Sequence, residues 1–233
     1  LFVWFWPGMA RRFPMHYHRM ICSLLGIRLR VIGQPPRQGP VLIASNHVSW
    51  IDILVLSAIA PLSFIAKREV GRWPFFGSLA RLQRTVFIDR DRRHATGNAR
   101  DEMRDRFRAG DILVLFAEGT TGDGRSILPF KSAFFGAAEY PGVLVQPVTL
   151  AYTGHHGLPM DRRTRPSYAW YGDMDLAPHL IEAIATGPVD VTVIFHEALS
   201  LSGERTRKHL AAHAEAEVRA GLVSALHHPA KMG

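Results

Sequence analysis

The feature that most constrains this chain is an apolar run that leads into a histidine and then into a helical segment. Val41–Ala44 is short and uninterrupted, which is typical of a buried strand. Ile51–Ala60 is apolar over a length that favours a helix. Between these segments lies His47, and Asp52 follows it by five residues. A strand that turns directly into a helix indicates a layered α/β fold.

His47 and Asp52 form a candidate catalytic pair. A carboxylate can hold one imidazole nitrogen, fix the tautomer and stabilise the imidazolium, which leaves the other nitrogen free to take a proton. Five helical steps rotate the chain by about 500°, so two residues inside one helix would point about 140° apart. The spacing therefore predicts that His47 lies in the turn before the helix, with its ring folded back over Asp52.

Strand and helix patterns alternate along the chain, which predicts an α/β fold with a mainly parallel central sheet and helices on both faces. The predicted strands are Arg28–Ile32, Val41–Ala44, Ser63–Ala66, Thr85–Ile88, Ile112–Phe116, Val143–Tyr152, Tyr168–Tyr171 and Val189–Phe195. The predicted helices are Ile51–Ile59, Phe75–Leu82, Arg92–Ala109, Ala133–Glu139, Leu176–Ala185 and Glu204–Leu226. The 233 residues suffice for one sizeable core. We expect a domain over residues 31–233, preceded by an N-terminal segment, residues 1–30.

The N-terminal segment is first aromatic and then basic. Leu1–Trp6 contains two Trp and two Phe, which suit the headgroup boundary of a bilayer, although six apolar residues are too few to span it. From Arg11 to Arg30, apolar residues recur at helical spacing among arginines, which predicts a membrane-associated amphipathic helix. An ordinary core-packing helix with a solvated basic face is the alternative. The net charge of +8 favours an anionic partner.

Three further segments place polar side chains after predicted strands. Arg84–Arg93 carries an arginine cluster, and the guanidinium fork suits phosphate or carboxylate. Glu118–Arg125 is a glycine-rich turn whose backbone N–H groups can approach an anionic or hydroxylic ligand. Lys131 ends an apolar stretch before a helix. The plain alternatives are a solvated helix start, a surface turn and a lysine that snorkels.

Other chemistries lack their sequence motifs. The chain has no G-x-S-x-G, no H-E-x-x-H, no Cys/His quartet and no P-loop motif. Serine hydrolysis, a metal site and P-loop nucleotide binding are therefore not expected. No RNA-binding or helix-turn-helix signature accompanies the basic charge, so we expect no nucleic-acid partner.

Four short blocks lie in order along the chain, each at the end of a predicted strand. They are Asn46-His47-x4-Asp52, Phe87–Arg90, Phe116–Thr120 and Val145–Val148. Taken together, they resemble the blocks of the glycerolipid acyltransferase family, in particular bacterial 1-acylglycerol-3-phosphate O-acyltransferases, over residues 25–200. The resemblance implies that His47 is the general base, that Asp52 orients it, and that the chain acylates the hydroxyl of a lysolipid.

The resemblance also implies ligands and a location. The residues expected to bind substrate are Asn46, Arg90, Glu118, Gly119, Thr120, Arg125 and Lys131. The acyl donor would be an acyl-acyl-carrier protein or acyl-coenzyme A, which serves as co-substrate, and no cofactor is expected. The enzyme would work on an anionic membrane surface, at the cytoplasmic face of the bacterial inner membrane.

The third block departs from the family pattern. Ala117 stands where many members have Pro, and Thr121 stands where many have Arg. The missing Arg removes a phosphate ligand and Asp123 adds a negative charge, although Arg125 could compensate. The block also resembles that of lyso-ornithine lipid O-acyltransferases, whose acceptor hydroxyl belongs to a 3-hydroxy fatty acid amide-linked to an amino acid. The leading acceptor is 1-acylglycerol-3-phosphate, lyso-ornithine lipid is the alternative, and a non-catalytic membrane lipid-binding protein is a further alternative.

Overall fold

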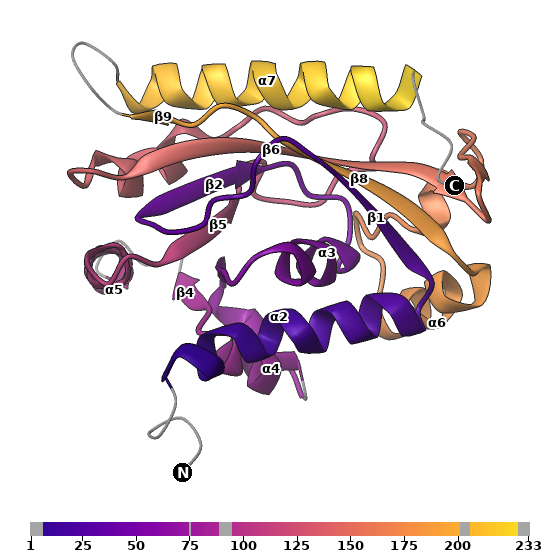
Figure 1. Cartoon of the computed structure of the whole chain (residues 1–233), viewed down its shortest axis with the longest axis horizontal. Helices are drawn as coiled ribbons and strands as arrows, with labels where there is room; N and C mark the ends of the chain where they lie inside the picture. The colour runs from indigo at the N-terminus through magenta and orange to yellow at the C-terminus, as the bar shows by residue number, and fades with distance from the viewer. Residues whose placement is uncertain (1–6, 75, 89–94, 201–205, 228–233) are drawn as a thin grey trace.

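The computed structural model describes residues 7–74, 76–88, 95–200 and 206–227. Within these residues a nine-stranded sheet crosses the molecule, and helices cover both of its faces (Figure 1). The strands are β1 (Ile27–Ile32), β2 (Val41–Ser45), β3 (Ser63–Lys67), β4 (Val86–Ile88), β5 (Ile112–Phe116), β6 (Leu144–His155), β7 (Leu158–Pro159), β8 (Val189–Phe195) and β9 (Leu199–Ser200).

The sheet has the order β1-β8-β6-β2-β5-β3-β4, and the short strands β7 and β9 also pair with β6. Strand β2 lies between β5 and β6 and is parallel to both. The pairs β1–β8, β3–β4 and β3–β5 are parallel as well. Strand β6 runs antiparallel to β8, β7 and β9. The sheet is therefore mixed and mostly parallel, which confirms the predicted α/β class.

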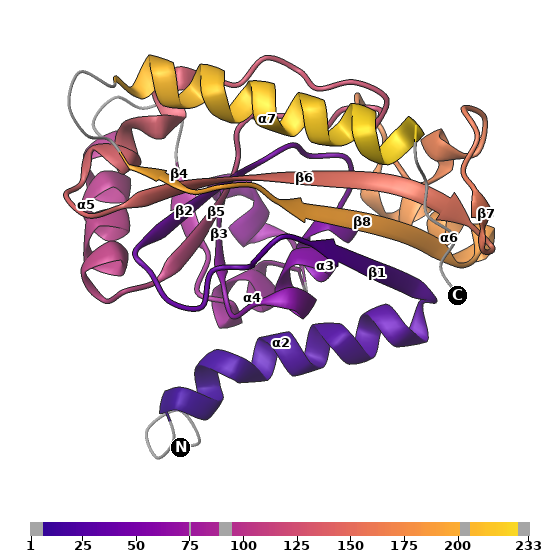
Figure 2. The same cartoon turned by 45° about the horizontal axis from the view of Figure 1, so that its top comes forward.

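The helices lie on the two sides of this sheet. In Figure 2, α2, α3 and α4 lie below the sheet and α7 lies above it. The α-helices are α2 (Pro7–Leu24), α3 (Ile51–Ile59), α4 (Phe76–Leu82), α5 (Ala95–Arg108), α6 (Leu176–Thr186) and α7 (Arg207–His227). The 3₁₀ helices are η1 (Arg68–Arg72), η2 (Ser132–Glu139) and η3 (Arg165–Ser167).

Alternate residues of the central strands supply two separate cores. In β2, Val41 and Ile43 pack in the same core as the buried residues of α3. Leu42 and Ala44 pack in the other core, with the buried residues of α7. All four side chains are almost fully buried. A strand buried on both faces needs no polar alternation, which is why Val41–Ala44 is a continuous apolar run.

Most predicted elements are present. Ile51–Ile59, Ile112–Phe116 and Val189–Phe195 have the predicted bounds, whereas Ala133–Glu139 forms part of a 3₁₀ helix and not an α-helix. The predicted strand Tyr168–Tyr171 is wrong, because this segment follows η3 and makes no strand pairing. Of its aromatic residues only Tyr168 is buried, and its hydroxyl donates to the carbonyl of Gly187 at 3.1 Å, whereas Tyr171 is exposed.

The predicted first residues of three helices, Phe75, Arg92 and Glu204, lie outside the described residues.

The helical pattern from Arg11 ends earlier than Arg30. Helix α2 ends at Leu24 and β1 begins at Ile27, with Gly26 between them at φ +67°. A left-handed glycine is a common helix stop. Strand β1 pairs with β8, so residues 27–30 belong to the central sheet. Among the helices that the structure describes, none is both long and apolar enough to cross a bilayer.

Candidate active site

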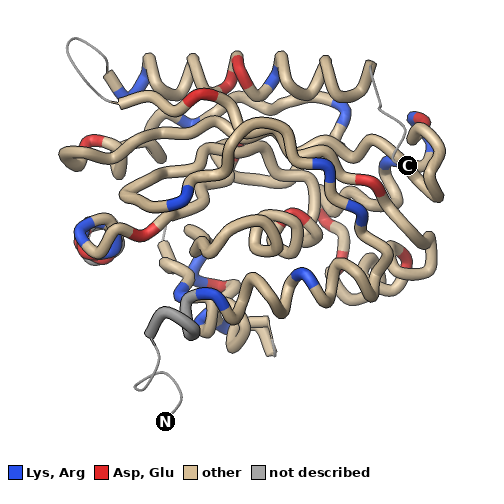
Figure 3. Tube along the Cα trace, in the orientation of Figure 1, with Lys and Arg blue, Asp and Glu red and all other residues tan. Residues whose placement is uncertain are grey.

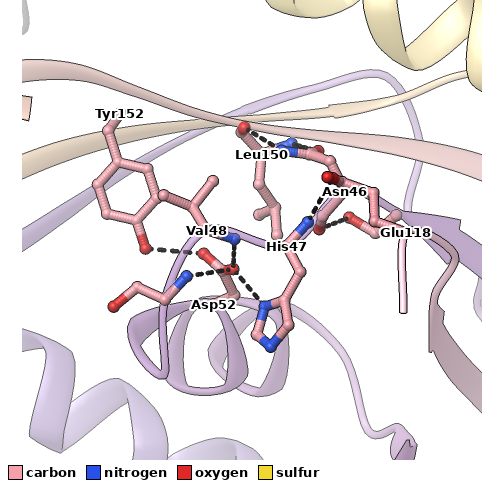
Figure 4. A network of polar contacts seen from close by, with 9 residues as sticks. Asn46, His47, Val48, Asp52, Glu118, Leu150 and Tyr152 are labelled. Carbon is pink, nitrogen blue, oxygen red and sulfur yellow. Dashed lines mark hydrogen bonds and ion pairs between the residues drawn. The ribbon is translucent and has the colours of Figure 1, made fainter. Parts of the chain in front are cut away.

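The ring of His47 folds back over the first turn of α3. Strand β2 ends at Ser45 and α3 begins at Ile51, which leaves His47 in the connecting turn. Its Nδ1 lies 2.8 Å from Oδ2 of Asp52, and Nε2 points away from the carboxylate (Figure 4). Nε2 makes no hydrogen bond to any residue in the described ranges, and the side chain is 16% exposed. The geometry leaves one imidazole nitrogen held and the other open.

The carboxylate of Asp52 is fully buried, with donors on both oxygens. Oδ2 accepts the backbone N–H groups of Val48 at 2.6 Å and Ser49 at 2.9 Å, in addition to His47. Oδ1 accepts the hydroxyl of Tyr152 at 2.7 Å. The start of a helix also favours negative charge. Since Asp52 is surrounded by donors, its contact with His47 requires the proton on Nδ1, which leaves the Nε2 lone pair to act as a base.

Phe116 fixes the plane of the imidazole. The two rings are stacked, with their centroids 3.7 Å apart and their planes inclined by 7°. Phe116 ends β5 and lies opposite Ser45 in the parallel register, so the sheet itself places this ring beside the turn. Contacts on one edge and one face therefore restrict the direction in which Nε2 points.

Glu118, the first residue of the glycine loop (residues 118–125), ties this loop to the histidine turn (residues 46–50). One carboxylate oxygen accepts the backbone N–H of His47 at 3.0 Å and the other accepts that of Leu128 at 3.1 Å. The residue is 2% exposed. Burial raises the pKa of Glu118 to about 7, although its two N–H partners act in the opposite direction. Both carboxylate oxygens of Glu118 therefore face backbone N–H groups, one in the histidine turn and one at Leu128.

Asn46 has a similar inward role. Its Nδ2 donates to the carbonyl of Leu150 at 2.9 Å, and its Oδ1 accepts the N–H of Leu150 at 2.8 Å. The side chain is 1% exposed. Both amide atoms are therefore engaged by β6, and the structure gives Asn46 a positioning contact where sequence reasoning expected a substrate contact.

The remaining residues of the predicted binding set surround the glycine loop. Gly119 has φ +74°, and a Cβ there would lie 2.8 Å from the ring of Phe134, so only glycine fits. Thr120 is exposed. Lys131 is also exposed, and its Nζ lies 5.8 Å from the centroid of the Phe134 ring. Arg90 lies outside the described residues.

Arg125 is exposed and already bonded to its own neighbourhood. Its Nη2 donates to the carbonyl of Arg162 at 2.7 Å, and its Nε lies 3.9 Å from Asp123. The loop runs close to the histidine turn, because a Cβ on Gly124 would lie 3.1 Å from Val48. The loop also contacts the histidine turn directly, since the N–H of Gly122 donates to the carbonyl of His47 at 2.8 Å.

Sequence reasoning missed Tyr152. It lies within a predicted strand and shares a face with Val148 and Leu150, which marks it only as a core residue. Its partner Asp52 is 100 residues away in the chain. A long-range polar contact of this kind leaves no local pattern.

The arrangement offers a proton acceptor backed by a buried anion, which suits activation of a hydroxyl group. Within the described ranges, no group of three or more His, Cys, Asp or Glu side chains is placed to hold a metal ion.

Comparison with known proteins identifies the family. The profile of the Acyltransferase family matches residues 28–151, more than half of the chain. The chain belongs to the acyltransferase family. The matched region of this acyltransferase begins in β1 and ends in β6, so it includes the histidine turn, Glu118 and Leu150.

Curated relatives extend the similarity over nearly the whole acyltransferase. It is 48% identical to a lyso-ornithine lipid O-acyltransferase from Brucella abortus, over 97% of this chain and 87% of the relative. It is 45% identical to a protein of the same name from Rhizobium meliloti, over 90% and 74%. It is 38% identical to a 1-acyl-sn-glycerol-3-phosphate acyltransferase from Neisseria meningitidis, over 71% and 64%.

A solved structure shares the fold. The 1-acyl-sn-glycerophosphate acyltransferase PlsC from Thermotoga maritima superposes with a TM-score of 0.67, over 92% of this chain and 78% of that chain. The two sequences are 22% identical, so this likeness concerns the fold alone.

Proposed function

We propose that this acyltransferase moves a fatty acyl group from a thioester to the hydroxyl of lyso-ornithine lipid. The observation that carries the proposal is the Nε2 of His47, which has no hydrogen-bond partner among the described residues, while Nδ1 donates to a buried carboxylate. The relatives named for this acceptor cover 97% and 90% of the chain, which supports the choice of substrate.

In the proposed mechanism, Nε2 of His47 takes the proton of the acceptor hydroxyl as its oxygen attacks the thioester carbonyl. The C–O bond forms, a tetrahedral intermediate collapses, and the C–S bond breaks. The leaving thiolate receives the proton from His47. Asp52 stabilises the transient imidazolium through Nδ1–H. This route needs no covalent acyl-enzyme.

The glycine loop supports a headgroup that carries an amine. Thr121 stands where a phosphate-binding Arg is common in the family, and Asp123 adds a carboxylate beside it. Arg125 is a weak substitute for that arginine, because its guanidinium donates to the backbone carbonyl of Arg162 and lies near Asp123. An ornithine headgroup keeps one amine and one carboxylate, so it tolerates this mixed charge better than a phosphomonoester does.

1-Acylglycerol-3-phosphate is the second candidate acceptor. The relative from Neisseria meningitidis bears that activity in its name at 38% identity. Both acceptors present a hydroxyl group to be acylated, so the same catalytic pair can serve either.

An acceptor assay separates the two candidates. Purified enzyme receives lyso-ornithine lipid or 1-acylglycerol-3-phosphate with one labelled acyl donor, presented in turn on acyl carrier protein and on coenzyme A. We expect transfer to lyso-ornithine lipid at a kcat/KM at least about tenfold higher. Preference for the phosphate acceptor would replace the first candidate by the second. Transfer to neither acceptor from either donor would refute the proposed function.

A variant sharpens this assay. Thr121→Arg restores the family arginine beside the loop, so the ratio of kcat/KM for the phosphate acceptor to that for lyso-ornithine lipid should rise by about five- to tenfold. Arg163→Lys, an exposed change that keeps the charge, serves as control. An unchanged ratio in Thr121→Arg would contradict the proposed role of the loop in selecting the headgroup.

We also propose that α2, the helix of the predicted N-terminal segment, binds an anionic membrane surface at the cytoplasmic face of the inner membrane, whereas residues 27–30 belong to β1. Phe13, Met20 and Leu24 of α2 are 66%, 52% and 73% exposed and lie on one helical stripe. The opposite stripe, which includes Cys22, is buried on the side of α3. Figure 3 shows basic and no acidic residues along the described part of α2. A helix with a second, exposed apolar stripe and positive charge suits a lipid interface.

Vesicle binding tests the membrane proposal. Phe13→Ser combined with Leu24→Ser should weaken binding to anionic vesicles by at least about tenfold. Val223→Ser is the control, since Val223 is 53% exposed on α7, across the sheet. Equal binding by the double variant and the native chain would refute this role of α2.

A further inference from the structure

Asp52 has two oxygens, and His47 uses only one of them. The other, Oδ1, lies 2.7 Å from the hydroxyl of Tyr152. Asp52 and Tyr152 both have exposed fractions of 0%. We propose that Tyr152 is a positioning residue of the acyl transfer reaction, which sets the orientation and proton affinity of the His47–Asp52 pair. This inference rests on the proposed general-base role of His47.

The topology of the sheet explains how Tyr152 reaches this place. Ser45, the last residue of β2, pairs with Val148, but β6 continues for seven more residues to His155. Val148, Leu150 and Tyr152 alternate along β6 and all face the core that contains α3. Tyr152 therefore projects past the end of β2, where α3 begins.

The same strand holds the histidine turn at two points. Leu150 binds the side chain of Asn46 through its backbone, and Tyr152 binds Asp52 two residues later. Asn46 and Asp52 lie on either side of His47 in the sequence. The position of the imidazole is thus fixed from both sides by one element.

The hydroxyl of Tyr152 is suited to act as a permanent donor. Burial raises the pKa of Tyr152 well above its usual range, and the charge of Asp52 acts in the same direction. The phenol therefore stays neutral at any pH at which the enzyme works. No other described residue donates a hydrogen bond to Oδ1 of Asp52.

Removal of the Tyr152 hydroxyl should shift the pH dependence of kcat in one direction. Without the phenol, Oδ1 becomes a buried and unpaired carboxylate oxygen, so the coupled His47–Asp52 pair binds a proton more tightly. Activity requires the unprotonated pair. The acid limb of the kcat profile should therefore move to higher pH.

The test compares Tyr152→Phe with Tyr168→Phe. Tyr168 is a buried tyrosine beside Tyr152, with the ring centroids 6.5 Å apart, but its hydroxyl bonds to His155 and to the carbonyl of Gly187. Tyr152→Phe should lower kcat by about 10- to 100-fold, leave both KM values within about twofold, and raise the acid limb by about 0.5 to 1 pH unit. Tyr168→Phe should leave the acid limb in place. An unmoved limb in Tyr152→Phe, or equal shifts in both variants, would overturn the proposal.

Two further measurements keep the inference separable from the proposed function. If the native enzyme transfers no acyl group, the pKa of the His47 imidazole is measured by NMR titration. It should rise in Tyr152→Phe and stay unchanged in Tyr168→Phe, and equal values would refute the inference. If Tyr152→Phe does not fold, 3-fluorotyrosine at position 152 provides a stronger donor and should move the acid limb to lower pH, whereas an unmoved limb would refute the role.

Discussion

The histidine turn and the glycine loop beside it are held in opposite ways. At the turn, the backbone carbonyls are held: those of Ser45 and His47 accept N–H groups from Ala117 and from Gly122 of the glycine loop, and that of Val48 accepts the N–H of Trp170. In the loop, the side chains of Thr120 and Arg125 are exposed, and Arg125 bonds to Asp123 of the loop itself and to the carbonyl of Arg162. Glu118 joins the two regions. Substitutions in the exposed loop can therefore change which headgroup is bound while the position of His47 stays the same.

The largest expected effect tests whether the turn carries the chemistry. His47→Ala removes the base and should lower kcat on the order of 10⁴-fold, at the upper end of general-base contributions. Because the ring is at the edge of the core, thermal unfolding should change little. His209→Ala, an exposed histidine of α7, is the control. A folded His47→Ala protein with native turnover would remove the turn from the reaction.

The next effect tests the buried anion. Asp52→Asn keeps the shape but loses the charge, so the imidazolium and the Nδ1–H tautomer are no longer favoured, and kcat should fall by about 10³-fold. Two backbone N–H groups also lose a charged acceptor, which should cost about 1–3 kcal/mol of unfolding free energy. Thermal unfolding and single-turnover rates measure both. Asp175→Asn, at the exposed start of α6, should show neither change.

The contact between the two regions can be tested through the effect of Glu118 on the pH dependence of the free energy of unfolding. Burial raises the pKa of Glu118 from 4.5 to about 7, so the folded protein holds this proton more tightly than the unfolded chain does. The stabilisation is complete below pH 4.5 and is lost as pH rises through 7, a difference of about 3 kcal/mol. In Glu118→Gln the free energy of unfolding should fall less across that window.

Chemical denaturation at several pH values measures this slope, with Glu102→Gln on the exposed face of α5 as control. A slope in Glu118→Gln equal to that of the native chain would contradict the assignment.

The smallest effect is expected in the loop. Arg125→Gln should leave kcat within about twofold and change the acceptor KM by less than about fivefold, because exposed charge contacts contribute little. The exposed Arg163, changed to Gln, is the matched control. A large fall in kcat would place Arg125 with the histidine turn and break the contrast between the regions.

The parts of the fold that the sequence predicts well are those with unbroken apolar patterns. β2 and β5 are almost continuous apolar runs with buried residues on both faces, so their positions follow directly from the sequence. β8 is the exception, because Asp190 and Thr192 alternate with its valines, yet it also has the predicted bounds. The strand predicted over Tyr168–Tyr171 is wrong: aromatic residues are enriched in strands, but here Tyr168 is buried directly after η3. Only the tertiary contact of Tyr168 with Gly187 distinguishes this segment from a strand.

The candidate site also has features that the sequence predicts and features that it does not. The spacing of His47 and Asp52 was sufficient to predict their contact, since a strand-to-helix turn allows few arrangements. The directions of Asn46 and Glu118 were not predictable, because a polar residue near a catalytic histidine can face either a ligand or the backbone. Their partners, Leu150 and Leu128, offer only backbone groups, which carry no sequence signal.

β6 holds the residues around His47 at two points, through Leu150 and Tyr152, so catalysis depends on correct assembly of the sheet. A slip of one residue in β6 would turn Tyr152 toward the opposite core and offer Asn46 a different backbone group. A misregistered chain would then lack an aligned base and could not cleave thioesters wastefully. Turnover can therefore serve as a sensitive reporter of whether two distant halves of the polypeptide have found their correct alignment.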